Sequence, residues 1–298
     1  RISLELLKNA LTTQENNSSF ISFFRQEIMN SSLKDSTKRN HLSTLMLLQE
    51  FKKNITFSDL TFELISSFEY FLQLKGYHTN TIAKHMKHLK RHVNIAINKE
   101  YIEIQKYAFR KYKIKTIENK HTHLVPEELE RLENLILSGR YVKLQKSLDA
   151  FLFCCYAGMR YSDFINLSSE NFVDINQETW LIYKSVKTGT EVRLPLYLLF
   201  SGKGIAILNK YRDNLEDFFH LRDNSNVNKD LIIITRLAGL SKRISFHTAR
   251  HTNATLLIYN GINITTVQKL LEHKSVKTTQ VYTNVMDMTI IHDLEKMK

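Results

Sequence analysis

The stretch that decides the fold covers residues 245–284 and reads SFHTARHTNATLLIYNGINITTVQKLLEHKSVKTTQVYTN. Ser245 is a residue type that caps helices, and apolar residues recur after it at helical spacing. We therefore expect a helix that ends near the Asn-Gly pair at 260–261. His247 and Arg250 share one face of this helix, because residues three apart are neighbours on a helix surface. The pattern predicts that both side chains reach one ligand.

Two shorter helical segments follow and add a histidine and a tyrosine. Apolar spacing predicts a helix over 264–271, with His273 just past its end. Ser275 can cap a third segment over 276–285, on which Tyr282 could reach a cleft. A single histidine or tyrosine in such a setting usually packs or faces solvent, so only the combination favours a functional site.

Two histidine pairs raise the question of a metal site. His247 and His251 lie four residues apart, as on a zinc-binding helix, but the segment reads HTARH and has Thr248 where a metalloprotease needs its glutamate. His121 and His123 form an HxH pair without further ligands, and we expect them to be solvated. The sequence therefore predicts no metal site.

The motif order resembles one protein family. The order is HxxRH, then LxH, then a tyrosine nine residues after that histidine, and it is carried by His247, Arg250, His251, His273 and Tyr282. It resembles the tyrosine recombinases, also called the phage-integrase family. The resemblance implies an enzyme that breaks and rejoins DNA without ATP, metal or another cofactor. It also requires one more arginine and a lysine upstream.

The upstream arginine is found after an apolar run. Residues 148–157 predict a buried helix, and Arg160 follows it closely, with Asp163 three residues further on. The segment GMRYSDFINL is similar to the region of the family's first catalytic arginine, although the acid in that region is more typically glutamate. The alternative is a local salt bridge between Arg160 and Asp163.

The upstream lysine is predicted on a β-hairpin. Residues 180–184 and 192–196 alternate as strands do, on either side of a turn over 187–190. In the family, a lysine on a hairpin lies between the two catalytic arginines, and Lys187 matches by order and by its KTG setting. Lys184 is the rival candidate.

The resemblance implies a division of roles. Tyr282 attacks a DNA phosphodiester and forms a 3′-phosphotyrosine, leaving a free 5′-hydroxyl. Charge builds on the non-bridging oxygens, to which Arg160 and Arg250 can donate paired hydrogen bonds. Lys187 protonates the leaving 5′-oxygen as a general acid.

Two histidines complete the set, beside one departure from the family. His247 assists proton transfer at the tyrosine, and His273 holds a phosphate oxygen. Family members usually carry glycine immediately before that second histidine, whereas this chain has Glu272. A glutamate near the phosphate could weaken the activity, or it could point to solvent.

The net charge of +12 is spread unevenly over the 298 residues. Residues 1–120 carry 20 Lys and Arg against 11 Asp and Glu. Such an excess commonly marks a surface that binds a polyanion, although a solvated basic face is also common. Adjacent Cys154 and Cys155 cannot form an ordinary disulfide, which fits a reducing cytoplasm. The resemblance implies that this is the cytoplasm of a bacterium, at the nucleoid. The longest apolar run, 150–157, is far short of a membrane span.

The length suffices for two domains, and with two prolines and eight glycines long helices should dominate. We expect a mainly α protein with a small antiparallel β-sheet. A helical core-binding domain covers 1–115, a basic linker 116–125, and an α+β catalytic domain with a C-terminal tail 126–298.

Local patterns predict helices capped by Ser36 and Ser58, the second over 57–68. The apolar run 231–234 fits either a buried strand or a loop.

The clearest helix of the first domain follows Asn80. Its apolar residues form one seam, and basic residues together with His88 take the other side. By resemblance, this domain clamps one side of the DNA duplex. Candidate phosphate contacts are Lys38, Arg39, Lys84, Lys87 and Arg91.

The resemblance also predicts the partners. Strand exchange needs two double-stranded DNA recombination sites and a homotetramer, with accessory DNA-bending proteins as further partners. The piece 286–298 docks on a neighbouring protomer or folds back on its own domain. Because the chain begins at Arg1, an arm-binding domain could precede it, which favours a mobile-element integrase. A type IB topoisomerase and a DNA-binding module with a dead site are the alternatives.

Overall fold

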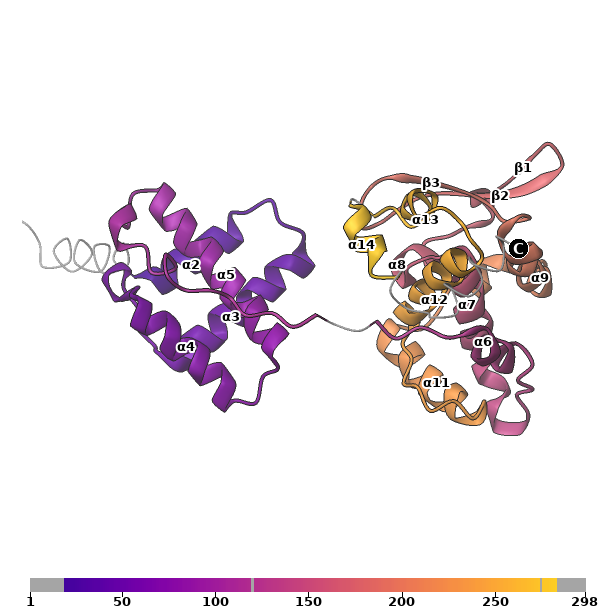
Figure 1. The fold of residues 1–298 in the computed structure, drawn as a ribbon, viewed down its shortest axis with the longest axis horizontal. Coiled ribbons are helices and arrows are strands. Elements are labelled where there is room, and N and C mark those ends of the chain that lie inside the picture. The colour runs from indigo at the N-terminus through magenta and orange to yellow at the C-terminus, as the bar shows by residue number, and fades with distance from the viewer. Residues whose placement is uncertain (1–18, 119–120, 274, 283–298) are drawn as a thin grey trace, which may run out of the picture. The chain divides into compact units, whose positions relative to one another are not determined.

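The computed structural model of the protein describes residues 19–118, 121–273 and 275–282. The chain divides into two compact units between residues 119 and 120. Helices dominate both units, and the strands of the described ranges form a three-stranded antiparallel sheet in the second (Figure 1). The predicted fold class, mainly α with a small antiparallel sheet, is confirmed.

The first unit is helical. Its elements are α2 (Phe20–Met29), α3 (Asp35–Phe51), η1 (Phe57–Asp59), α4 (Phe62–Leu74), α5 (Thr79–Asn98) and η2 (Ile104–Lys106), where η denotes a 3-10 helix. The side chains of Ser19 and Thr61 accept hydrogen bonds from backbone amides and so cap α2 and α4. Large apolar side chains fill the space between the helices, among them Phe20, Phe24, Leu45, Phe68 and Met86.

Two helix starts in this unit were predicted wrongly. The expected helix over 57–68 is split, because the carboxylate of Asp59 accepts from the backbone amide of Thr56 at 2.7 Å and closes a separate turn. The helix α4 then begins at Phe62 with Thr61, not Ser58, as its cap. The helix α3 begins at Asp35, so Ser36 lies inside the helix and is not its cap.

The amphipathic pattern of α5 is confirmed for the apolar seam. The seam is buried at Ile82, Met86, Leu89 and Val93. The basic side of the helix is exposed at Lys84, Lys87 and Arg91. On α3, Arg39 is exposed, whereas Lys38 is half-buried and donates to the carbonyl oxygen of Met29 at 3.1 Å. Four of the five candidate phosphate contacts are therefore open to a ligand.

His88 was predicted on the outer face of α5, and this is wrong. Its Nδ1 lies 2.8 Å from Oγ1 of Thr44, and its ring stacks on His41 with centroids 4.0 Å apart. Thr44 Oγ1 also lies 2.8 Å from Nδ1 of His85, and Nδ1 of His41 lies 3.1 Å from Nε2 of His92. These five side chains form a polar layer between α3 and α5, because each supplies a hydrogen-bond partner to another.

The histidines of this layer resist protonation. Burial lowers the pKa of His85 and of His88 to about 4, and the pKa of His92 to about 3. Burial also lowers the pKa of His41, and the charge of Arg91 acts in the same direction. The folded first unit therefore holds this layer in the neutral form.

We predict that acid destabilises the protein through this layer. An unfolded chain protonates its histidines near pH 6.5, whereas the folded layer stays neutral down to about pH 4, so stability is present above pH 6.5 and is lost between these values. Urea unfolding at several pH values should show a loss of up to about 1.4 kcal/mol per pH unit for each histidine. His92→Leu should reduce the slope, and His78→Asn, at an exposed site, should not. Equal slopes in all three proteins would contradict the prediction.

The second unit surrounds one buried helix. Its elements are α6 (Pro126–Glu133), η3 (Gly139–Leu144), α7 (Gln145–Ala157), α8 (Tyr161–Phe164), η4 (Ser169–Asn171), β1 (Phe172–Ile175), β2 (Glu178–Lys184), β3 (Glu191–Pro195), η5 (Leu199–Gly202), α9 (Lys203–Lys210), α10 (Leu215–Phe219), α11 (Asn224–Leu237), α12 (Phe246–Tyr259), α13 (Ile264–Leu270) and α14 (Val276–Gln280). Every residue of α7 from Ser147 to Ala157 is buried. Most of its buried side chains are apolar, and the buried carboxylate of Asp149 is paired with Lys210 and accepts a hydrogen bond from Tyr211.

The helix α12 packs along α7 (Figure 1). The amide of Asn253 on α12 donates to the carbonyl oxygens of Cys155 and Tyr156, at 2.9 and 3.0 Å. These carbonyls belong to the last turn of α7. Carbonyl groups in the last turn of a helix find no amide donor within that helix, so Asn253 supplies one. A polar contact thus fixes the register of the two helices at the end that carries Gly158 and Arg160.

The sheet has the order β1-β2-β3, with both neighbours antiparallel. Leu181 pairs with Leu194 and Tyr183 with Val192, and all four side chains are buried against the helices. The predicted hairpin is therefore present, and Pro195 is the last residue of β3. Its turn, residues 185–190, lies at the end of the sheet where Thr188 contacts Glu272, just beyond α13.

Other expectations need correction. The run 231–234 is neither strand nor loop but part of α11, where Leu231 and Ile234 pack inward at helical spacing. In the segment expected to be helical over 276–285, the helix α14 ends at Gln280, so Tyr282 lies two residues beyond it, and residues 283–285 are outside the described residues. The piece 286–298 is outside the described residues. No helix within the described ranges is both long and apolar enough to cross a membrane.

Candidate active site

The centre of the candidate site is Arg250 on α12, whose side chain is only 2% exposed. Its Nη1 donates to the carbonyl oxygen of Gly158 at 2.9 Å, and its Nη2 donates to the carbonyl oxygen of Leu271. Burial, followed by the charge of Arg160, lowers the pKa of Arg250 to about 10. The group therefore remains a cation at neutral pH, held between the ends of α7 and α13.

Gly158 is required where α7 meets α12. It ends α7 in the left-handed conformation, with φ of +67°. A Cβ atom there would lie 2.7 Å from Oδ1 of Asn253 and 2.9 Å from Cδ2 of Leu271. Because Gly158 has no Cβ atom, its backbone can lie this close to Asn253 and Leu271. The close approach places the carbonyl oxygen of Gly158 where Arg250 donates to it.

We predict that Gly158→Ala destabilises the protein by roughly 2–4 kcal/mol, from left-handed strain together with the two close contacts. Gly239→Ala is the matched control, because Gly239 has φ of +66° and a Cβ atom added there would meet nothing within 4 Å. The control should cost about 1–2 kcal/mol, from strain alone. Chemical denaturation measures both, and equal losses would show that the close approach is unimportant.

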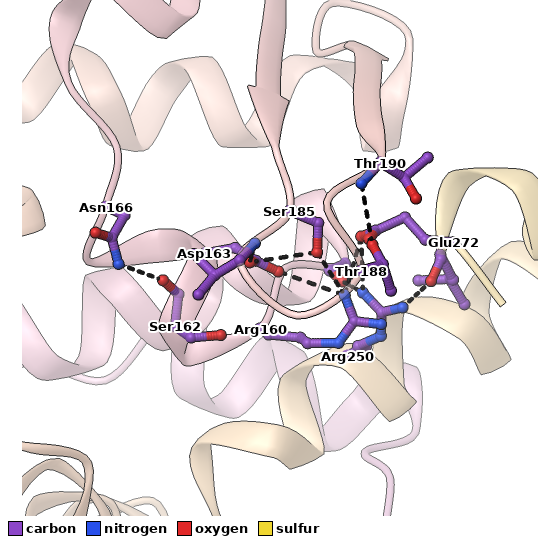
Figure 2. A network of polar contacts seen from close by, with 12 residues as sticks. Arg160, Ser162, Asp163, Asn166, Ser185, Thr188, Thr190, Arg250 and Glu272 are labelled. Atoms are coloured by element: carbon purple, nitrogen blue, oxygen red, sulfur yellow. Dashed lines mark hydrogen bonds and ion pairs between the residues drawn. The ribbon is translucent and has the colours of Figure 1, made fainter. Parts of the chain in front are cut away.

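The second arginine of the site, Arg160, lies just beyond α7 and occupies the N-cap position of α8. Its Nη1 is 3.0 Å from Oε1 of Glu272, 3.3 Å from Oγ of Ser185 and 3.4 Å from Oδ2 of Asp163. The local salt bridge with Asp163 is thus present, but it is the longest of these contacts. Figure 2 shows the guanidinium groups of Arg160 and Arg250 side by side below the hairpin.

Glu272 joins the two arginines to the hairpin turn. Its Oε1 lies 3.0 Å from Arg160 and 3.9 Å from Nη1 of Arg250, and its Oε2 accepts from Oγ1 of Thr188 at 2.7 Å (Figure 2). The side chain is 3% exposed. The expectation that it could point to solvent is wrong, because it turns into the space between the two cations.

The backbone at Glu272 has a conformation that favours glycine. Glu272 follows the end of α13 with φ of +51°. Its amide donates to the carbonyl of Lys269, and the amide of His273 donates to the carbonyl of Gln268. This is a Schellman motif, whose left-handed position glycine fills without a steric penalty.

The hairpin is tied to the arginines at its base. Oδ1 of Asp163 accepts from the backbone amide of Val186 at 2.9 Å. Lys187, the next residue, is exposed on the turn, and its charge acts on His247. Lys184 is exposed on β2, where it pairs in register with Glu191. Of the two candidate lysines, the structure therefore links Lys187 electrostatically to the other predicted residues.

The histidines of the site are neutral bases. Burial lowers the pKa of His251 to about 3 and that of His273 to about 4, with the charge of Arg250 acting in the same direction on both. His247 has an exposed ring, yet desolvation and the charges of Arg250, Arg160 and Lys187 lower its pKa to about 4. The rings of His247 and His251 contact each other edge to face, with centroids 4.6 Å apart.

Tyr282 is buried, with 6% of its surface exposed. Its hydroxyl lies 2.7 Å from Nδ1 of His251, and because that ring is neutral it can accept the phenolic proton in a hydrogen bond. The ring of His273 stacks on Tyr282 with centroids 6.2 Å apart. Burial raises the pKa of Tyr282, and the charges of Arg250 and Arg160 oppose this rise. The tyrosine is thus held as a neutral phenol close to both cations.

The predicted residues therefore meet in one region, though they come from segments far apart in the chain. These residues are Arg160, Lys187, His247, Arg250, His273 and Tyr282. The sequence did not assign a contact to His251, which the HxxRH spacing places one turn from His247. It also missed His121, whose ring stacks on His251 with centroids 4.4 Å apart. Over residues 19–118, 121–273 and 275–282 no group of three or more His, Cys, Asp or Glu side chains is arranged to hold a metal ion.

Comparison with protein families gives two matches. Residues 122–288 match the phage integrase family, and residues 19–114 match the phage integrase SAM-like domain. The first match covers more than half of the chain and includes both arginines, Lys187, the HxxRH helix, His273 and Tyr282.

Two curated relatives illustrate the sequence similarity. The chain is 30% identical over 179 residues to a tyrosine recombinase of Pseudothermotoga lettingae, covering 58% of this chain and 60% of that protein. It is 28% identical over 270 residues to the tyrosine recombinase XerD of Oceanobacillus iheyensis, covering 84% of this chain and 86% of that protein. The chain thus spans somewhat less than two thirds of the first relative and most of the second.

Solved structures show the same fold. A lambda integrase (75–356) dimer bound to a COC′ core site aligns with a TM-score of 0.73 at 17% identity, over 88% of this chain and 93% of that one. XerH bound to a palindromic difH substrate, in a post-cleavage complex, aligns with a TM-score of 0.69 at 18% identity, over 94% and 95%. At these identities the likeness concerns the fold alone.

Proposed function

The chain belongs to the phage integrase family, the tyrosine recombinases, which cleave and rejoin DNA, and from this premise we propose that it is a site-specific recombinase with Tyr282 as nucleophile. One observation carries the proposal. Arg160 and Arg250 converge on a single anionic group, the carboxylate of Glu272, close to a tyrosine held by the HxxRH helix. A phosphodiester offers guanidinium groups the same kind of oxygen acceptor.

The chemistry we propose is a transfer of one phosphodiester bond. The phenolic oxygen of Tyr282 attacks phosphorus in line, the bond from phosphorus to the 5′-oxygen breaks, and a 3′-phosphotyrosine forms. The new ester keeps the free energy of the broken bond, so the 5′-hydroxyl of another strand can reverse the step without ATP. Two pairs of such exchanges, one pair for each strand of the duplex, recombine two duplexes.

We assign the transition-state charge to the two arginines. Negative charge grows on the non-bridging oxygens during the attack, and both guanidinium groups can donate hydrogen bonds to them. Arg250 is fixed by the carbonyls of Gly158 and Leu271, so little reorganisation is needed when the phosphate arrives. We assign protonation of the 5′-oxygen to Lys187, which is exposed on the hairpin turn.

The tyrosine must leave its resting position for this reaction. Its hydroxyl is bonded to His251 and its surface is buried, so a bound duplex could not reach it there. We propose that DNA binding frees the phenol from His251. His247, a neutral and exposed base beside His251, then assists transfer of the phenolic proton, and His273 holds a phosphate oxygen.

The partners follow from the same proposal. Double-stranded DNA is bound by the second unit and by the exposed cations of the first, and a homotetramer assembles on two duplexes, as in the lambda integrase tetramer bound to a Holliday junction. Accessory DNA-bending proteins assist, and the reaction takes place in the cytoplasm at the nucleoid. The Tn1549 transposon integrase, in complex with a circular intermediate DNA, shares the fold at 15% identity, with a TM-score of 0.72 over 94% of this chain and 99% of that one. We propose that this chain is likewise the integrase of a mobile element.

The type IB topoisomerase alternative is less well supported, because the relatives reported above are recombinases and integrases. A topoisomerase relaxes supercoiled DNA as a monomer and without sequence preference. The recombinase instead requires two sites of defined sequence and yields joined products.

We predict that a nicked suicide substrate carrying the recognition sequence traps a covalent protein–DNA adduct, because the released fragment cannot return to reverse the attack. Tyr282→Phe should abolish the adduct and keep DNA binding, since only the nucleophilic oxygen is removed. Denaturing gel electrophoresis measures the adduct and a mobility shift measures binding. An adduct that survives in Tyr282→Phe would reject this nucleophile, and no adduct from the parent would reject the enzyme.

A second prediction concerns the paired N–H donors of the Arg160 guanidinium group. Arg160→Lys keeps a positive charge but loses the paired donors, so the rate of adduct formation should fall by about 10²–10³-fold, as for loss of one oxyanion donor. The control Arg193→Lys changes an exposed arginine of β3 that pairs with Glu191 and should leave the rate unchanged. Single-turnover kinetics at saturating DNA measure both, and a loss smaller than threefold in Arg160→Lys would remove Arg160 from the chemistry.

A further inference from the structure

Glu272 stands where the proposed mechanism needs a phosphate. Its carboxylate contacts Arg160 at 3.0 Å and Thr188 at 2.7 Å, and it lies 3.9 Å from Arg250. Carboxylate and phosphate oxygens accept from guanidinium groups in the same way. The side chain is almost fully removed from solvent, so this is an enclosed contact and not a surface ion pair.

The local backbone does not favour a glutamate at this position. A left-handed residue other than glycine costs roughly 1–2 kcal/mol, and φ of Glu272 is +51°. The hydrogen bonds of the Schellman motif use only backbone groups, so they do not require this side chain. What the side chain adds is its contacts with the two arginines and with Thr188.

The charges show why an internal anion suits the free protein. Arg160 and Arg250 are close enough for the charge of Arg160 to lower the pKa of Arg250, and their side chains are only 14% and 2% exposed. Two cations in such a space are unstable without a counter-anion. Asp163 partners Arg160 alone, at 3.4 Å, so Glu272 is the carboxylate that faces both. A carboxylate and a DNA phosphate in the same space would repel each other.

We propose, on the basis of the function proposed above, that Glu272 occupies the scissile-phosphate position in the DNA-free protein and must be displaced by the DNA phosphate before cleavage. Displacement breaks the bond to Thr188 and so releases the turn that carries Lys187. One exchange of anions therefore reaches the turn of the proposed general acid.

The first test measures anion binding and does not depend on cleavage. In a Tyr282→Phe background, Glu272→Gln keeps the size of the side chain and removes its charge, and calorimetric titration with inorganic phosphate reports on the arginine pair. If the carboxylate leaves the site open one tenth of the time, the variant should bind phosphate about tenfold more tightly. Glu133→Gln is the control, because Glu133 pairs with Lys203 outside the site. Unchanged or weaker phosphate binding in Glu272→Gln overturns the proposal.

The second test separates displacement from simple support of the arginines. In single-turnover cleavage of the suicide substrate, Glu272→Gln should lower the DNA concentration that gives half the maximal rate by at least severalfold, and the maximal rate should not fall. If Glu272 only supports the arginines, the maximal rate falls and the half-saturating concentration does not, which overturns the proposal. If even the parent forms no adduct, the proposed function fails, and the phosphate titration still decides on Glu272.

A further variant guards against misfolding. Thr188→Val removes the hydroxyl that donates to Glu272 and leaves both arginines intact, so it should shift phosphate affinity in the same direction as Glu272→Gln but by less. Thermal unfolding adds a second measurement. Glu272→Gln should melt at a lower temperature than the parent without phosphate, and added phosphate should raise its melting temperature more than that of the parent. Equal responses to phosphate in the parent and in both variants contradict the proposal.

Discussion

The second unit depends on one constraint, the burial of a guanidinium cation at Arg250. A buried cation without partners is strongly unfavourable, so the group needs acceptors within the protein. Nη1 and Nη2 each donate to a carbonyl oxygen, one of Gly158 and one of Leu271, at the ends of two different helices. The packing of α7, α12 and α13 is therefore fixed at the point where Arg160 and Glu272 also lie.

The same constraint sets the charge state of the side chains around it. Desolvation lowers the pKa values of His247, His251 and His273 to about 4, 3 and 4, and the charge of Arg250 acts in the same direction on all three. Neutral imidazoles can accept protons or hydrogen bonds, as His251 does from Tyr282. A site with two cations, neutral bases and a neutral phenol lacks only an anion, and in the free protein Glu272 supplies it.

Much of this site could be predicted from local sequence. The spacing of HxxRH places its residues on one helix, and the apolar run before Arg160 and the KTG turn are equally local signals. Local signals failed where a side chain found a distant partner. His88 was assigned to solvent because it follows the basic residues on the outer side of α5. Its side chain instead contacts Thr44 and stacks on His41, both on α3. The run 231–234 was ambiguous because a short apolar segment fits a helix as well as a strand.

The sequence by itself determined the helical class, the hairpin and the identity of the residues in the motifs, because these depend on periodicity and spacing within one segment. Only the tertiary structure decided how those residues face one another. It turned Glu272 into the space between the arginines and buried Tyr282 against His251. Neither outcome is encoded locally, since both result from electrostatic and packing contacts between segments that lie from 31 to 112 residues apart in the chain.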